Sequence, residues 1–382
     1  MRKQLLVTGI AISSCLIPLK AQAVSFTGLN IFGDSLSDSG NLFNLTDTLL
    51  TPLGIPALPP PPYAQVNSNG PIWVDNLGEA LGLSPTLATD LLLDPTTSPP
   101  TEGINFAFAG ALSSDSHVLD DDLPFLEDFL PGFQDQIDAF TNLSATLPAD
   151  PEALYVVWIG ANDYNDALSA PASPGGSPIE QLPNTVTNNI ISGLEQLSSL
   201  GAKEFLVVNL PPIGEAPFAD FLEAQTQQDV PTLFNQLSSA HNDLLSAKLN
   251  VFGQRQPDVN ITTFDINTLF TDILSDPMSF GLTNVTESCL TNFEPVFQFD
   301  GVCQNPNEFL FWDDTHPTTA AYQIVSDFAL AALNNGDTTT KSVPEPGALK
   351  SLFIMGLTGS GLLLAKRKRA RRLGKPDLGM KV

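Results

Sequence analysis

The chain has 382 residues, of which 42% are hydrophobic, and its formal net charge is −26 at pH 7. Between Val24 and Thr340 lie 40 of the 42 Asp and Glu residues but only three of the 16 Lys and Arg residues, so this body carries a formal charge of −37. A body without a basic face argues against nucleic acid as a partner and against tight docking on anionic membranes. We interpret the acidity as a solubility feature of an exported protein.

The first 23 residues have the pattern of a secretory signal peptide. Met1-Arg2-Lys3 gives a charged start, an apolar run extends to Leu16, and Ala21-Gln22-Ala23 matches an A-x-A cleavage site. The apolar run is shorter than the roughly 20 residues that a membrane span needs, so we expect cleavage after Ala23 rather than a retained anchor. The protein is therefore predicted to be secreted or exposed on the cell surface.

Residues 24–340 are expected to form one domain with a parallel sheet. Short apolar segments typical of buried strands alternate with amphipathic stretches typical of helices. The expected strands are 29–32, 155–159, 205–210 and 261–264, and the expected helices are 186–200, 233–251 and 318–333. This alternation predicts an α/β fold with helices on both faces of the sheet.

Three Pro-rich or Gly-rich segments are predicted to be long loops. They are residues 51–63, 94–103 and 166–183. Such loops either shape an acyl pocket or lid, or serve as solvated spacers.

Polar residues follow two of the expected strands. Ser35 comes after the first strand and Asn162 after the strand at 155–159. Both are expected at the carboxyl edge of the sheet, where ligands bind in open parallel folds. There the Ser35 hydroxyl can act as a nucleophile, and the N–H groups of Ser35 and Gly110 with the Asn162 amide can hold an oxyanion. Taken singly, each glycine in these segments indicates only a turn.

A serine nucleophile needs a base, and the chain has three histidines. His117 lies in a polar stretch, and His241 lies in an amphipathic helix where a packing or surface role is expected. Asp313 precedes His316 by three residues, a spacing that can bring a carboxylate alongside the imidazole and fix its tautomer. We predict Ser35, His316 and Asp313 as catalytic residues, although Asp-x-x-His alone also fits a chance pair or metal ligands.

Four blocks in this order resemble the GDSL, or SGNH, hydrolase family. They are Gly-Asp-Ser-Leu at 33–36, Asn-Phe-Ala-Phe-Ala-Gly-Ala at 105–111, Gly-Ala-Asn-Asp at 160–163 and Asp-x-x-His-Pro at 313–317. The resemblance implies a flavodoxin-like three-layer α/β/α sandwich and an acyl-serine mechanism without metal ion or organic cofactor. It makes Ser35 the nucleophile and an oxyanion donor, adds Gly110 and Asn162 to the oxyanion hole, and makes His316 the base and Asp313 its orienting partner.

The segment 62–75 further resembles the lecithinase/haemolysin and plant-lipase branch of that family. Two positions depart from the branch, because Val66 stands where an Arg is usual and Ala109 replaces the commoner first glycine of its block. Neither departure removes a catalytic atom. Both leave the substrate preference open.

Cysteine usage agrees with export. Cys15 belongs to the predicted leader, which leaves Cys289 and Cys303 enclosing a short segment. In an oxidising exterior this pair is predicted to form a disulfide. Metal binding by the pair is not expected, because no Cys-x-x-Cys spacing or nearby His completes a site.

Residues 341–382 form a separate tail. Val343-Pro344-Glu345-Pro346 precedes an apolar run at 352–365 and a basic segment at 366–372. This pattern resembles the PEP-CTERM sorting tails of Gram-negative bacteria, which an exosortase-type enzyme processes. A run of 14 residues reaches only about 21 Å as a helix, so we expect transient membrane contact followed by cleavage. An ordinary C-terminal anchor is the alternative.

The leading functional hypothesis is hydrolysis of carboxylic esters, including acyl lipids. A second enzymatic hypothesis is a deacetylase or acylesterase acting on exported polysaccharide, which the sorting tail suggests. A third is a non-catalytic surface or matrix protein that uses the fold for adhesion. The complete Ser, Asn, Asp and His set argues against this third hypothesis, because adhesion would not require all four.

Overall fold

The computed structural model describes residues 24–94, 96–97, 100–120, 123–169, 179–293 and 298–335. The predicted signal peptide at 1–23 and the predicted sorting tail at 341–382 lie outside these residues. Across the described ranges, no helix has both the length and the apolar character needed to cross a membrane.

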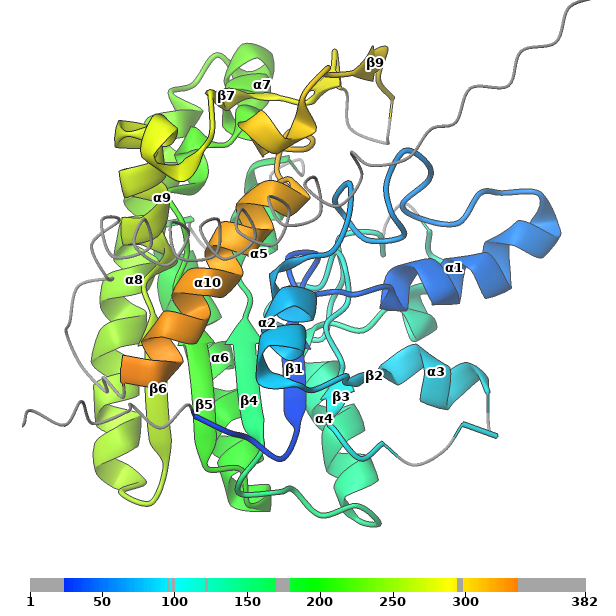
Figure 1. Ribbon diagram of the computed structural model, residues 1–382, viewed down its shortest axis with the longest axis vertical. Coiled ribbons are helices and arrows are strands. Elements are labelled where there is room, and N and C mark those ends of the chain that lie inside the picture. Colours follow the sequence, from blue (N-terminus) through cyan, green and yellow to red (C-terminus); the bar gives the residue numbers. More distant parts are fainter. Residues whose placement is uncertain are drawn as a thin grey trace, which may run out of the picture.

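A six-stranded parallel sheet forms the centre of the molecule, with the order β2-β3-β1-β4-β5-β6 (Figure 1). Its strands are β1 (Leu29–Gly33), β2 (Thr86–Leu87), β3 (Ile104–Asn105), β4 (Leu154–Trp158), β5 (Glu204–Val208) and β6 (Asn260–Phe264). Apart from the short edge strand β2, this is the order of flavodoxin-like folds, so the predicted fold class is confirmed. The four predicted strands are found within two residues of their predicted ends.

Ten α-helices lie in the described part of the chain. They are α1 (Asn41–Leu50), α2 (Trp73–Leu81), α3 (Ala88–Leu93), α4 (Phe133–Ser144), α5 (Ala161–Ser169), α6 (Leu182–Leu200), α7 (Pro217–Thr226), α8 (Val230–Arg255), α9 (Ile266–Ser275) and α10 (Thr319–Asn335). The predicted helices correspond to α6, α8 and α10.

The predicted loop at 166–183 is wrong at both ends. Helix α5 continues to Ser169, and α6 already begins at Leu182. Pro183 stands in the first turn of α6, where a proline fits because its missing N–H has no partner within the helix. Residues 170–178, which include the Pro-Gly-Gly motif, lie outside the described residues.

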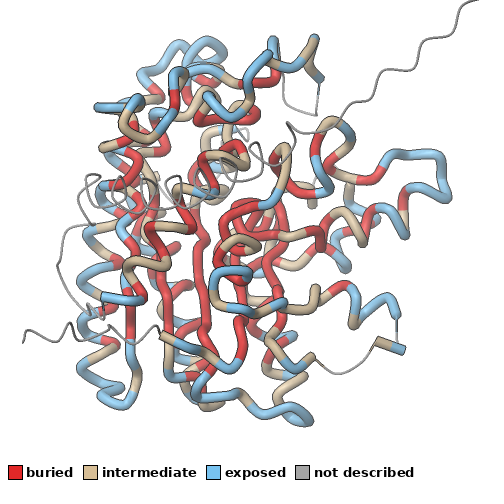
Figure 2. The backbone as a smooth tube through the Cα atoms, viewed as in Figure 1, coloured by how far each residue is buried: buried red, intermediate tan, exposed pale blue. Residues whose placement is uncertain are grey.

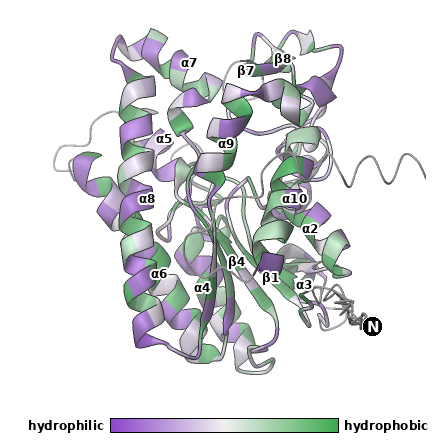
Figure 3. Ribbon diagram, turned by 60° about the vertical axis from the view of Figure 1, so that its left-hand side comes forward, coloured by the Kyte–Doolittle hydropathy of each residue, from purple (hydrophilic) through white to green (hydrophobic). Residues whose placement is uncertain are grey.

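Alternating side chains of the strands pack against helices on opposite faces of the sheet. Phe32, Tyr155 and Phe205 pack with α4, α6 and α8, whereas Ile31 and Val156 pack with α2, α9 and α10. Figure 2 shows the central strands buried, and Figure 3 shows the sheet between its two helical layers. The structure is therefore a three-layer sandwich.

The carboxyl ends of β1 and β4 meet at the point where the strand order reverses, since β3 lies on one side of β1 and β4 on the other. Ser35 follows β1, and Asn162 follows β4 at the start of α5. Ligands of open parallel sheets bind in the crevice at such a reversal. The fold therefore places the predicted nucleophile and amide donor at the expected edge.

The predicted disulfide between Cys289 and Cys303 is present, with the two Cα atoms 4.8 Å apart. It links the ends of a small antiparallel pair, β8 (Leu290–Thr291) and β9 (Gly301–Val302). Just before it, β7 (Asn284–Ser288) pairs with β10 (Phe309–Phe311). The Leu290 N–H donates to the carbonyl of Trp312 at 2.8 Å, so this peripheral unit is tied to the segment that leads into Asp313.

We predict that replacing both cysteines with serine lowers the free energy of unfolding by about 3 kcal/mol, because a closed loop of this length restricts the unfolded chain. Urea unfolding of the oxidised proteins measures the difference. Wild-type protein in reductant is the matched control, and its stability should fall to that of the double variant. Equal stability of the oxidised wild type and the variant would contradict the prediction.

Candidate active site

Ser35, His316 and Asp313 form one chain of hydrogen bonds, although Ser35 and His316 are 281 positions apart. His316 Nε2 lies 2.8 Å from Ser35 Oγ, and His316 Nδ1 lies 2.7 Å from Asp313 Oδ2. A carboxylate partner on Nδ1 places the proton there, so Nε2 accepts from the serine hydroxyl. This is the geometry of a nucleophile, its base and an orienting group.

The Asp313 carboxylate is 2% exposed and fully hydrogen-bonded. Its Oδ1 accepts the backbone N–H groups of Thr315 at 2.8 Å and His316 at 2.6 Å, and its Oδ2 also accepts the hydroxyl of Tyr63 at 2.8 Å. Burial raises the pKa of Asp313, but the charge of His316 and these backbone donors outweigh burial and hold the pKa below its usual range. The group is therefore an anion at neutral pH.

The interaction between Asp313 and His316 shifts the pKa of His316 in the opposite direction, upward. Burial lowers the pKa of His316, but the charge and hydrogen bonds of Asp313 outweigh burial, so that the pKa lies above its usual value. The imidazolium that forms when His316 takes a proton is consequently stabilised.

The turn that presents Ser35 depends on a close approach between β1 and β4. A Cβ atom on Gly33 would lie 2.3 Å from the carbonyl oxygen of Trp158, so only glycine fits there. The side chain of Gln136 bridges Gly33, accepting its N–H at 2.9 Å and donating to its C=O at 2.8 Å. The end of β1, just before Ser35, is thereby held at both its N–H and its C=O.

The buried carboxylate of Asp38 joins the turn that follows β1, which carries Ser35, to the glycine block. It accepts the N–H groups of Gly40, Asn41 and Leu42, which begin α1, and the N–H of Ala109 at 2.8 Å. The segment before Gly110 is therefore fixed relative to the turn that carries Ser35.

Gly110 has a φ of 92°, and a Cβ atom on it would lie 2.5 Å from Cε1 of His117. The ring of His117 is buried, with Nδ1 accepting the Leu119 N–H at 3.0 Å and Nε2 lying 2.6 Å from the carbonyl oxygen of Ala109. His117 therefore supports the glycine block and lies outside the chain of Ser35, His316 and Asp313. Within the described residues, the N–H groups of Ser35 and Gly110 donate no hydrogen bond, which leaves both available to a ligand.

The side-chain amide of Asn162 uses one of its two N–H donors within the protein. Its Nδ2 donates to the carbonyl of Ala111 at 3.0 Å, which ties the asparagine block to the glycine block. An amide NH₂ carries two hydrogens, so one donor remains for a ligand.

His241 behaves as expected of a packing residue, because it is fully buried with Nδ1 3.0 Å from the Tyr164 hydroxyl.

Three further buried carboxyl groups belong to residues next to Ser35, Asn162 and Asp313 in the sequence. Burial raises the pKa of Asp34 to about 7 and that of Asp163 to about 6, and burial together with Asp313 raises the pKa of Asp314 to about 7. Asp163 accepts both the N–H and the hydroxyl of Ser113, at 3.0 and 2.7 Å.

Across the described ranges, no three His, Cys, Asp or Glu side chains cluster as a metal site requires.

Sequence reasoning did not find Tyr63 or Gln136. Tyr63 stands 250 positions before Asp313, and Gln136 stands 103 positions after Gly33. The only available signal was the place of Tyr63 directly after four prolines, at the end of a segment that resembles one branch of the hydrolase family.

Ser35 lies at the carboxyl edge of the central sheet, and the turn after β10 brings His316 and Asp313 to it. This geometry matches the arrangement of serine hydrolases. The family model for GDSL-like Lipase/Acylhydrolase matches residues 29–328. A GDSL esterase/lipase of Arabidopsis thaliana is 30% identical over 346 residues, covering 83% of this chain and 91% of the plant protein. A phosphatidylcholine-sterol acyltransferase of Aeromonas hydrophila is 26% identical, covering 82% of this chain and 92% of that protein.

The chain therefore belongs to the GDSL-like lipase/acylhydrolase family. It is an enzyme of the esterase and lipase class, which excludes the purely adhesive hypothesis.

We predict that Asp34→Asn stabilises the protein at pH 8 but not near pH 4. With a folded pKa of about 7 against 3.8 in the unfolded chain, Asp34 keeps a proton in the native state that the unfolded state releases, so native stability falls as pH rises through this window. Asparagine retains the acceptor for the Leu36 N–H and cannot ionise. The gain at pH 8 is about 4 kcal/mol at most.

Urea midpoints at pH 4 and pH 8 measure this effect. Asp94→Asn is the control, because Asp94 is exposed and its hydrogen bonds with Thr96 lower its pKa, so no gain at pH 8 is expected. An Asp34→Asn protein that is less stable than wild type at pH 8 would show that the native state needs the charge.

Proposed function

We propose that the protein is an exported serine esterase that hydrolyses carboxylic esters through an acyl-serine intermediate. The observation that carries this proposal is the hydrogen-bonded chain from Ser35 Oγ through His316 to Asp313, with 2.8 and 2.7 Å between successive partners. The unengaged N–H groups of Ser35 and Gly110 support the same proposal.

In the proposed reaction, Ser35 Oγ attacks the ester carbonyl carbon while His316 Nε2 takes its proton. The oxyanion that develops is held by the N–H groups of Ser35 and Gly110 and by the remaining amide hydrogen of Asn162. His316 then protonates the leaving alcohol. A water molecule, deprotonated by His316, finally hydrolyses the acyl-Ser35 bond and restores the serine.

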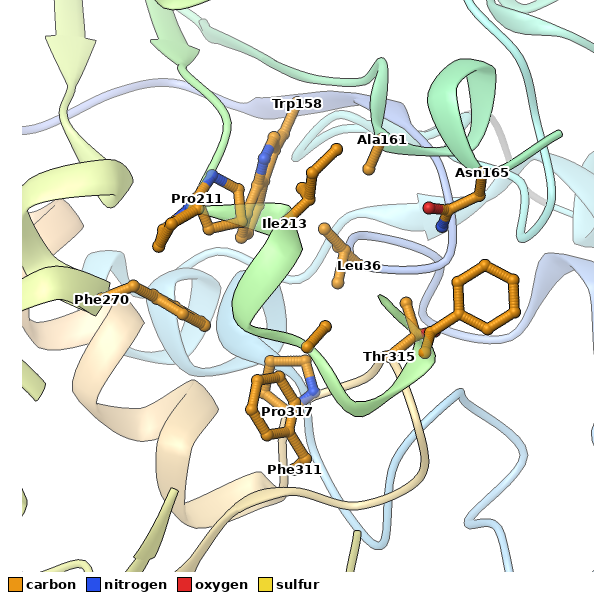
Figure 4. Close-up of a pocket in the computed structure, with 13 residues that line it drawn as sticks. Leu36, Trp158, Ala161, Asn165, Pro211, Ile213, Phe270, Phe311, Thr315 and Pro317 are labelled. Atoms are coloured by element: carbon orange, nitrogen blue, oxygen red, sulfur yellow. The ribbon is translucent and has the colours of Figure 1, made fainter. Parts of the chain in front are cut away.

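An apolar pocket opens beside this site (Figure 4). Leu36 borders Ser35 in the chain, and Thr315 and Pro317 border His316. Apart from Asn165 and Thr315 the lining is apolar: Leu36, Trp158, Ala161, Pro211, Pro212, Ile213, Ala216, Phe218, Phe270, Phe311 and Pro317. Burial of hydrocarbon contributes about 0.8 kcal/mol per methylene, so the lining favours an acyl chain over an acetyl group. This supports acyl esters over the polysaccharide deacetylase alternative.

We predict that Ser35→Ala abolishes labelling by a fluorophosphonate and nearly all esterase turnover, because the remaining rate comes only from binding and the oxyanion donors. Ser37→Ala is the matched control. It removes another buried hydroxyl of the same turn, which accepts from Trp73, and should still be labelled. Labelling of folded Ser35→Ala protein would refute the serine mechanism.

A panel of p-nitrophenyl esters from acetate to palmitate tests the acyl pocket. We expect kcat/KM to rise by up to about fourfold per methylene until the pocket is filled. Ala216→Trp, which adds bulk to the lining, should lower the rate for long chains and leave acetate hydrolysis unchanged. A wild-type enzyme that prefers acetate would favour the deacetylase alternative instead.

Export and processing are part of the proposal and rest on the composition of the two ends. We predict that the mature protein from its native host begins after Ala23 and has lost the apolar and basic segments at 352–372. Intact-mass measurement checks this. A mass that includes residues 352–372 would favour a retained C-terminal anchor over cleavage by an exosortase-type enzyme.

A further inference from the structure

We propose that Tyr63 is a positioning residue of the catalytic chain, whose hydroxyl holds the Asp313 carboxylate and lowers the basicity of His316. The inference rests on the catalytic roles proposed above for Asp313 and His316. It deepens them by assigning a function to the end of the proline-rich segment at 51–63.

Tyr63 and His316 share one oxygen of Asp313. The Tyr63 hydroxyl donates to Asp313 Oδ2 at 2.8 Å, and His316 Nδ1 lies 2.7 Å from the same atom and 3.0 Å from Oδ1. The other oxygen, Oδ1, is occupied by the backbone donors of Thr315 and His316. The carboxylate therefore has a donor on each oxygen besides the imidazole, which fixes its rotation.

The hydroxyl of Tyr63 remains a donor at any pH at which the protein is folded. Tyr63 is 6% exposed, and burial followed by the charge of Asp313 raises the pKa of its phenol far above the ordinary value. A phenol that keeps its proton beside a carboxylate forms a charge-assisted hydrogen bond, which is stronger than a neutral one.

Packing holds the Tyr63 ring independently of that bond. The ring meets Trp312 edge to face, with centroids 6.1 Å apart and planes at 89°. Tyr63 and Trp312 share one buried cluster with Cys289 and Leu290, so the disulfide unit lies against this ring. A bond at 2.8 Å from the hydroxyl of Ser68 to the carbonyl of Pro317 ties the following segment to the same turn.

The hydroxyl dipole points its positive end at the atom that His316 also contacts. It therefore weakens the attraction between the carboxylate and an imidazolium, and its removal should raise the pKa of His316. The other titratable groups that face this pair are Asp34, Asp314 and the buried Tyr322. These groups stay the same when only Tyr63 is changed, so a difference between variants reports the Tyr63 hydroxyl.

The experiment is an NMR titration of ¹³C-labelled histidine in protein without a histidine tag, since the chain has three histidines and His316→Gln identifies the signal of His316. Tyr63→Phe keeps the ring on Trp312 and removes the hydroxyl. We expect the pKa of His316 to rise by about half a unit to one unit, and kcat at neutral pH to fall about tenfold with little change in KM. The acid limb of kcat/KM should move to higher pH with the titration.

Tyr155→Phe is the matched control. Tyr155 lies on β4, and its hydroxyl donates to the carbonyl of Asp150 at 3.0 Å. Removing this hydroxyl should leave the titration of His316 unchanged. An unshifted His316 in Tyr63→Phe would overturn the inference.

If Tyr63→Phe does not fold, 3,5-difluorotyrosine at position 63 keeps the hydroxyl as a stronger donor. It should move the pKa of His316 downward, and an upward or absent shift would overturn the inference. A wild-type protein without esterase activity whose His316 still responds to Tyr63 would refute the proposed function alone, whereas an active enzyme with an unresponsive His316 would refute only the role of Tyr63.

Discussion

The rest of the site depends on the hydrogen bonds that hold Asp313 as a buried anion. A buried carboxylate is costly unless hydrogen bonds and an opposite charge replace its hydration, and here the partners come from the segment at 313–316 and from Tyr63. Once the anion is held, it fixes the tautomer of His316, and that tautomer aims Nε2 at the Ser35 hydroxyl. Each later step of the proposed reaction uses this orientation.

The charge balance of the chain leaves its buried carboxylates few cationic partners. Few Lys and Arg side chains exist in the body, and the ion pairs of the described part are Arg255 with Glu195, on the surface, and His316 with Asp313. Asp38 and Asp163 are held by backbone N–H and hydroxyl donors instead of cations. Asp38 thereby joins the start of α1 to the glycine block at Ala109, and Asp163 joins α5 to Ser113.

Much of the fold and of the candidate site could be predicted from the sequence, because short stretches of residues indicate them directly. Short continuous apolar segments specify the four longer strands, and the spacing of Asp313 and His316 places both groups in one turn, where the structure has them. Strands β2 and β3 have two residues each, too few for a periodic pattern to show. The contact of Tyr63 with Asp313 has no local signal, because it depends on how the proline-rich segment folds back over the last third of the chain. The predicted loop extends too far, to Pro183, because proline is common both in loops and in the first turn of a helix.

The site is supported from two directions. Ser35, Gly110 and Asn162 are fixed by the sheet and its connections, through Gln136, Asp38 and Ala111. Asp313 and His316 instead follow β10, at the periphery, where Trp312, Tyr63 and the disulfide unit pack together. Ser35, Gly110 and Asn162 thus lie beside the large core clusters of the sheet, whereas Asp313 directly follows Trp312, a member of the small buried cluster that includes Tyr63 and Cys289. With the role proposed for Tyr63, a change in that cluster would alter the basicity of His316 while Ser35 stays in place, which would make the peripheral cluster the part of the enzyme that sets the base strength.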